Sequence, residues 1–102
     1  MNKFEALENY ENMFLKVIRI FQVKITSSKG ERTEYRALIV NKFANSKYFL
    51  EAYSIPSLEE ELNRESEAIE KDVEEFSQKM RFCLRKGFIK IPEESIIWQY
   101  LS

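Results

Sequence analysis

The sequence predicts an α+β fold in which helices pack on antiparallel β-hairpins. Three observations lead to this class. One long segment has apolar residues at helical spacing, a second is rich in β-branched residues, and the only two glycines, Gly30 and Gly87, each follow a lysine in turn-like surroundings. The chain has 102 residues, of which 44% are hydrophobic, so we expect a single domain over residues 1–102.

The first expected element is a helix of about three turns over residues 3–15, because Phe4, Leu7 and Phe14 stand at helical spacing. From residue 17 the chain becomes rich in valine and isoleucine, which favours a strand. Residues 17–40 therefore predict a β-hairpin that turns near Gly30.

The two faces of this hairpin predict its register. Apolar residues gather on one face when Ile25 pairs with Tyr35, Val23 with Ala37 and Phe21 with Ile39. The opposite face then holds Gln22, Lys24, Arg36 and Leu38. After a loop over residues 41–45, Ser46 fits the cap of a short helix through Tyr53, and residues 47–55 fit a third strand equally well.

The strongest helix signal starts at Ser57. Ser57 and Glu60 form a capping box, in which each side chain satisfies a free backbone N–H of the first turn. The apolar stripe that follows comprises Leu58, Leu62, Ile69, Val73, Phe76 and Met80.

The end of this helix has two interpretations. The helix continues to Lys86 with Gly87 as a left-handed cap, or it stops near Lys79 and Lys86-Gly87 turns a second hairpin. We favour the hairpin, since it sets Leu84 opposite Ile89 and Phe82 opposite Ile91 on one apolar face. A final short helix is expected over residues 93–101.

With this hairpin the chain looks duplicated. Residues 1–56 and 57–102 would each contain a helix, a hairpin turning at Lys-Gly, and an aromatic-rich segment. The sequence therefore predicts two similar structural halves, although the halves share little residue by residue.

The inventory of reactive side chains argues against an enzyme. The chain has no histidine, so it lacks a base with an ordinary pKa near 7, and Cys83 lies between Phe82 and Leu84, as a buried inert thiol would. Neither zinc-ligand clusters nor a glycine-rich phosphate loop is present in the sequence. We expect a non-enzymatic protein without a cofactor or a metal site.

The net charge of −1 conceals three charged blocks. Residues 16–50 carry a net +6, residues 57–75 a net −7 and residues 76–92 a net +5. One hypothesis is nucleic-acid binding by the last block, through Arg81, Arg85, Lys86 and Lys90. The alternative is that acidic and basic blocks neutralise each other within the fold.

Two aromatic segments, residues 46–53 and 95–101, hold more apolar groups than one buried stripe needs. Aromatic residues are frequent binding anchors, and open hairpin edges accept guest strands. The favoured hypothesis is a protein–protein interaction module that binds a peptide, a partner protein or a second copy of the chain near the junction of the halves. The predicted binding residues are Tyr48, Phe49, Tyr53, Trp98 and Tyr100. The alternative is that they pack between the halves.

The expected location is intracellular. Residues 1–15 are acidic and unlike a signal peptide, the longest purely apolar run is residues 37–40, and a lone cysteine forms no internal disulfide. No contact with a membrane is expected.

The chain also resembles the small proteins of filamentous viruses that infect thermophilic archaea, of the Acidianus filamentous virus type. The resemblance rests on chain length, the Glu/Lys-rich and histidine-free composition, the two Lys-Gly turns, and the segments KYFLEAY and IIWQYL. It implies a host-cytoplasm setting and a role in protein contacts, and it carries over no functional residue.

Overall fold

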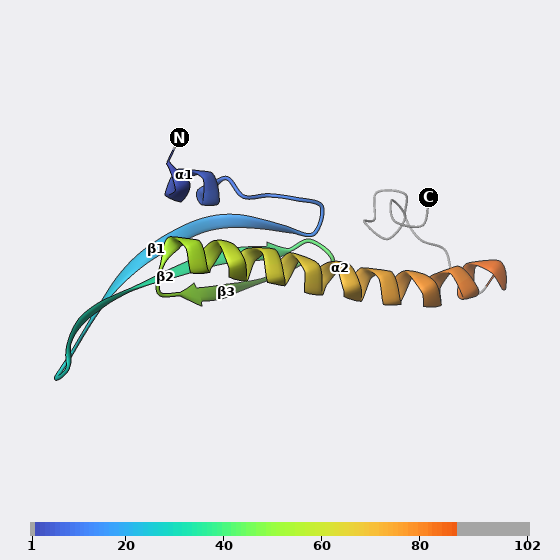
Figure 1. Ribbon diagram of the computed structural model, residues 1–102. Helices are drawn as coiled ribbons and strands as arrows, with labels where there is room; N and C mark the ends of the chain where they lie inside the picture. Colours follow the sequence, from blue (N-terminus) through green and yellow to red (C-terminus); the bar gives the residue numbers. More distant parts are fainter. Residues whose placement is uncertain (1, 88–102) are drawn as a thin grey trace.

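The computed structural model describes residues 2–87, and they form an α+β fold in which one long helix lies on a three-stranded antiparallel sheet. The order is α1 (Lys3–Glu8), β1 (Leu15–Ser27), β2 (Gly30–Asn41), β3 (Ser46–Ala52) and α2 (Ile55–Arg85). Strand β2 lies between β1 and β3. Figure 1 shows α2 running along one face of the sheet and continuing beyond it, while the β1–β2 turn projects the opposite way. The predicted fold class is therefore confirmed.

Helix α1 is shorter than the predicted helix over residues 3–15. It ends before Asn9, and Asn12 then organises a turn: its side-chain oxygen accepts hydrogen bonds from the N–H groups of Phe14 and Leu15 at 2.8 and 3.0 Å. The Asn12 amide also donates to Ser66 Oγ of α2 at 2.9 Å. These local side-chain bonds compete with helix continuation, which is why the helix stops early.

The predicted hairpin exists, but its register was wrong. Ser27 pairs with Gly30, so the loop contains only Ser28 and Lys29, and the positive φ of Gly30 (114°) resembles that of a type I turn followed by a bulge glycine. Ile20, rather than Val23, therefore lies opposite Ala37.

A separate shift of register lies between Val17 and Arg19. The pairing moves from Val17 opposite Ile39 to Arg19 opposite Leu38, which leaves Ile18 as the extra residue. Such a bulge allows Val17 and Ile20 to point to the same side of the sheet despite their odd spacing. A prediction that assumes strict alternation of side chains between the two faces therefore fails for this strand.

Residues 46–52 form the third strand, which was one of the two alternatives that the sequence allowed. Helix α2 then starts two residues before the predicted Ser57. Ser54 is the N-cap, its Oγ accepting from Ser57 N at 3.2 Å, and Pro56 stands in the first turn, where a missing N–H does no harm.

Helix α2 has 31 residues and continues to Arg85, so the first strand of the favoured second hairpin was wrong. The other interpretation matches: Gly87 follows the helix with a φ of 72°. The helix propensity and apolar spacing of residues 79–85 prevail over their alternation. The predicted helix over 93–101 lies outside the described residues, and the two-halves hypothesis stays a prediction.

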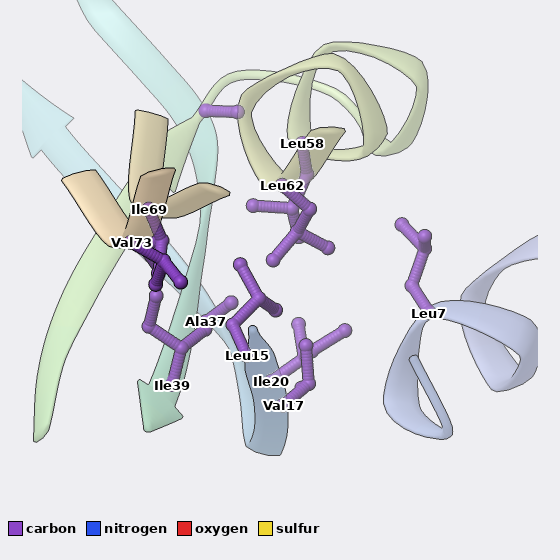
Figure 2. Close-up of a cluster of buried hydrophobic side chains, with 11 residues drawn as sticks. Leu7, Leu15, Val17, Ile20, Ala37, Ile39, Leu58, Leu62, Ile69 and Val73 are labelled. Atoms are coloured by element: carbon purple, nitrogen blue, oxygen red, sulfur yellow. The ribbon is translucent and has the colours of Figure 1, made fainter. Parts of the chain in front are cut away.

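The core lies between α2 and the sheet. Figure 2 shows Leu58 and Leu62 of α2 directed toward Leu15 and Val17 of β1, with Leu7 of α1 closing one side. The rest of the cluster comprises Ile20 of β1, Ala37 and Ile39 of β2, Ala52 of β3, and Ile69 and Val73 of α2. Since the buried hydrophobic side chains of the sheet point to α2, the other side of the sheet has no helix over it within residues 2–87.

Candidate functional site

The side of the sheet that faces away from α2, which we call the open face, is a candidate binding surface in the described part of the chain. Strand pairing identifies its members, because cross-strand partners point to the same side. Two rows of paired residues cross the three strands on this face. One row consists of Phe21, Arg36 and Glu51, and the other of Arg19, Leu38 and Phe49. Val23 and Glu34 form a third pair on this face.

Two exposed phenylalanines mark the centre of the open face. The rings of Phe21 and Phe49 meet edge to face, with centroids 6.1 Å apart and an interplanar angle of 61°. Phe49 is 53% exposed and Phe21 is 37% exposed. The guanidinium carbon of Arg19 lies 5.0 Å from the Phe21 ring centroid, a cation–π distance. An aromatic pair exposed in this way is typical of a surface that binds a partner.

Charged side chains surround this aromatic pair. Glu34 is buried, and its two carboxylate oxygens accept ionic contacts from Arg32 at 3.2 Å and from Arg36 at 3.4 Å. Arg36 Nε lies 3.5 Å from Glu51 but makes no hydrogen bond to any residue in the described range 2–87. Burying Glu34 without these arginines would leave a desolvated charge without a partner. The two arginines therefore stabilise the part of the open face around Glu34.

Tyr53 stands at the end of β3, next to this ionic cluster. Its side chain is 67% exposed, and the guanidinium carbon of Arg32 lies 5.6 Å from its ring centroid. Tyr53, Glu34, Glu51 and Ala52 line a shallow pocket. Of the predicted binding residues, Phe49 and Tyr53 are thus accessible on one side of the sheet.

Tyr48 lies on the opposite side and serves the fold. Its hydroxyl donates a hydrogen bond of 2.5 Å to Glu65 Oε1 of α2. Burial raises the pKa of Tyr48 to about 12, with a further contribution from the hydrogen bond to Glu65 and its negative charge. Tyr48 and Phe49 are neighbours in a strand, so they point to opposite faces and cannot act as one binding group. Trp98 and Tyr100 lie outside the described residues.

The cations predicted to bind nucleic acid stand on the last turns of α2 instead of a hairpin. Arg81, Arg85 and Lys86 are exposed there, and Lys86 Nζ lies 5.9 Å from the ring centroid of Phe82, which is itself 54% exposed. Cations at a helix C-terminus also interact favourably with the helix dipole, so they have a structural role as well. Lys90 lies outside the described residues.

Sequence reasoning missed Phe21 and the arginines around it. The predicted register assigned Phe21 to the buried face, whereas Phe21 lies opposite Arg36 on the open face. The signal that could have found it is the tight Ser-Ser-Lys-Gly turn, since a two-residue loop fixes the register that places Phe21 beside Arg36.

Within residues 2–87, no three His, Cys, Asp or Glu side chains are grouped closely enough to hold a metal ion. The thiol of Cys83 is half-buried and free. The helices of that same part of the chain include none with both the length and the apolar character needed to cross a bilayer. Comparison of the chain with known proteins found no matching protein family, no matching curated protein and no matching solved structure.

Proposed function

We propose that this chain is a protein–protein interaction module that binds an extended segment of its partner at the open face and along the outer edge of β3, which pairs with no strand within residues 2–87. The observation that carries the proposal is the exposed edge-to-face pair of Phe21 and Phe49 on a sheet face that α2 does not cover. An exposed aromatic pair on a sheet offers apolar area on a backbone that is already ordered, which reduces the entropic cost of partner binding.

The binding energy available at Phe49 is considerable. A phenylalanine side chain buries up to roughly 200 Å², so covering the exposed 53% of Phe49 removes about 100 Å² from water. At about 25 cal/mol per Å² this contributes ~2.5 kcal/mol, the size of an interface hot spot.

The edge of β3 supplies the second part of the proposed site. Strand β3 has seven residues in unbroken register with β2, and it contains neither a proline nor a bulge. The start of β1, by contrast, is already paired with backbone from the preceding segment. Val17 N donates a hydrogen bond to Tyr10 O at 2.9 Å, and Glu11 and Lys16 form an isolated antiparallel β-bridge. A regular unprotected edge accepts a guest strand through backbone hydrogen bonds.

The test is a selection of short random peptides on the immobilised full-length protein. We expect enriched peptides with alternating apolar residues, since every second side chain of an added strand reaches the open face. Selected peptides should lose at least tenfold in affinity for Phe49→Ala and for Phe21→Ala, measured by fluorescence anisotropy.

Phe82→Ala is the matched control. Phe82 is 54% exposed, almost the same as Phe49, but it lies on the last turns of α2, away from the open face. Its replacement should leave peptide affinity unchanged. Equal peptide affinity in wild type and in a folded Phe21→Ala/Phe49→Ala variant would refute the proposed site.

Nucleic-acid binding is the second candidate, and the basic end of α2 favours it. Lys79, Arg81, Arg85 and Lys86 are exposed beside the exposed ring of Phe82, so phosphates and one base have possible contacts there. This function requires affinity for a single-stranded oligonucleotide that falls steeply as the salt concentration rises. Arg81→Glu should lower this affinity further. Lys24→Glu makes the same change of charge on β1 and should leave the affinity unchanged. An absence of binding at low salt would remove this candidate.

A further inference from the structure

We propose that the guest strand at the β3 edge is the β3 of a second copy of this chain, so that two copies form one continuous sheet about a two-fold axis at Phe49. This inference rests on the proposed function, because it names the partner for the same edge. It rests on the sequence of β3, which is complementary to itself when it is read in the reverse direction.

A two-fold axis perpendicular to the sheet keeps the faces of both copies aligned. Each β3 residue then pairs with a residue of the same face in the antiparallel copy. With the axis at Phe49, the two Phe49 rings lie opposite each other on the open face. Lys47 lies opposite Glu51 of the copy, and Glu51 lies opposite its Lys47.

The side of β3 that faces α2 is equally compatible. Tyr48 lies opposite Leu50 of the copy, and both residues are half-buried within one chain. Ser46 lies opposite Ala52. The cross-strand pairs therefore combine an aromatic with an aliphatic residue, two small residues, two aromatic residues, or two opposite charges. Such combinations are favourable between neighbouring strands.

Neighbouring registers lose this complementarity. Moving the axis to Tyr48 sets Glu51 opposite Asn45 of the copy instead of Lys47. Moving it to Leu50 sets the Glu51 carboxylate against the Phe49 ring, so either shift separates the opposite charges. The charge pattern of β3 thus selects one register, in the way that charged pairs fix strand pairing generally.

Contacts within one chain leave room for these pairs. Lys47 makes no ion pair within residues 2–87, although it is exposed on the open face. The Glu51 side chain is 60% exposed, and its contact with Arg36 uses one carboxylate oxygen at 3.5 Å. The Phe21–Phe49 pair of each copy would join its counterpart in one cluster of aromatic rings on the open face.

A charge-swap experiment tests both the dimer and its register. Analytical ultracentrifugation of the full-length protein should show a reversible dimer. Lys47→Glu and Glu51→Lys each create two like-charge pairs across the axis, and each should raise the dimer dissociation constant roughly tenfold. The double variant Lys47→Glu/Glu51→Lys restores opposite charges and should restore the dimer.

The mixture of the two single variants provides the control for folding. Glu51→Lys also removes the contact with Arg36, but that loss is the same in the single and the double variant. Mixing Lys47→Glu with Glu51→Lys should give heterodimers more stable than either homodimer, since every charged pair across the axis is then opposite in sign.

A monomeric wild type at all concentrations would overturn the inference, as would a dimer that the single swaps leave unchanged or that the double swap fails to restore. None of these outcomes bears on the peptide selection described above, in which loss of affinity in Phe49→Ala reports on partner binding at the open face. Failure of the dimer and failure of the interaction module are therefore distinguishable.

Discussion

Removing the hydroxyl of Tyr48 should loosen β3 from α2 without disturbing the packing of the ring. The hydroxyl donates a 2.5 Å hydrogen bond to the Glu65 carboxylate and also interacts with the Asn41 side chain, and Tyr48→Phe removes the hydroxyl while keeping the ring. Hydrogen bonds to charged acceptors contribute about 1.5–3 kcal/mol. Because Tyr48 is only half-buried and water can reach Glu65, we expect a lower loss of ~1–2 kcal/mol in the free energy of unfolding.

Urea unfolding followed by circular dichroism measures this loss. For a domain of this size the loss corresponds to a midpoint lowered by about 1 M, with an unchanged dependence on urea concentration. The control is Tyr53→Phe, which removes the same atom from a side chain that is 67% exposed and makes no hydrogen bond within residues 2–87. Equal midpoints for wild type and Tyr48→Phe would refute the role assigned to this bond.

The same bond predicts a dependence on alkaline pH. Burial and the carboxylate of Glu65 raise the pKa of Tyr48 to about 12 in the folded state, above the ordinary value of 10.0 that applies after unfolding. The stabilisation is therefore complete below pH 10 and is lost as the pH rises from about 10 to about 12. The difference in stability between wild type and Tyr48→Phe should shrink over this range, and a constant difference would contradict the assignment.

Three further changes test other parts of the fold. Leu62→Ala removes a fully buried side chain of α2 and should lower the free energy of unfolding by ~2–5 kcal/mol in urea titrations, whereas a loss below ~1 kcal/mol would contradict its place in the core. Gly30→Ala places a side chain at a φ of 114° in open space, so backbone strain alone should cost about 1–2 kcal/mol by the same measurement, and an unchanged midpoint would exclude that strain. The hydrogen bond from Lys42 and its positive charge hold the pKa of Glu11 below its ordinary value, so this ionic contact stabilises the fold above the ordinary carboxyl pKa and is lost as the pH falls through the lowered one. Lys42→Met should raise the pKa of Glu11 in an NMR titration of its carboxyl carbon, and an unshifted titration would show that Lys42 is not the cause.

Local patterns sufficed to predict the kinds of element in this chain. Strand-forming residues on both sides of a turn at Gly30 predicted the first hairpin, and the stripe from Leu58 to Met80 predicted α2. These features depend on residues close together in the sequence, where propensity and periodicity act directly.

The bulge near the start of β1 could not be predicted in the same way. The bulge at Ile18 allows both Val17 and Ile20 to enter the buried core, a requirement that arises only in the tertiary structure. The error at Phe21 came instead from the turn: the two-residue loop fixes the register that places Phe21 on the open face, and this error was decisive for the candidate site. Aromatic binding residues in the segment 46–53 were the favoured hypothesis, but the division between Tyr48 and Phe49 follows from which face α2 covers.

The proposed binding surface is tested most directly by NMR, with a selected peptide titrated into the isotope-labelled full-length protein. If the open face and the β3 edge bind the peptide, the largest shift changes will cluster at residues 47–51 and at Phe21, with the ring signals of Phe49 among them. The signals of Phe82 and Arg85 at the end of α2 should stay in place. Shift changes confined to the end of α2, with β3 unaffected, would contradict the proposed surface.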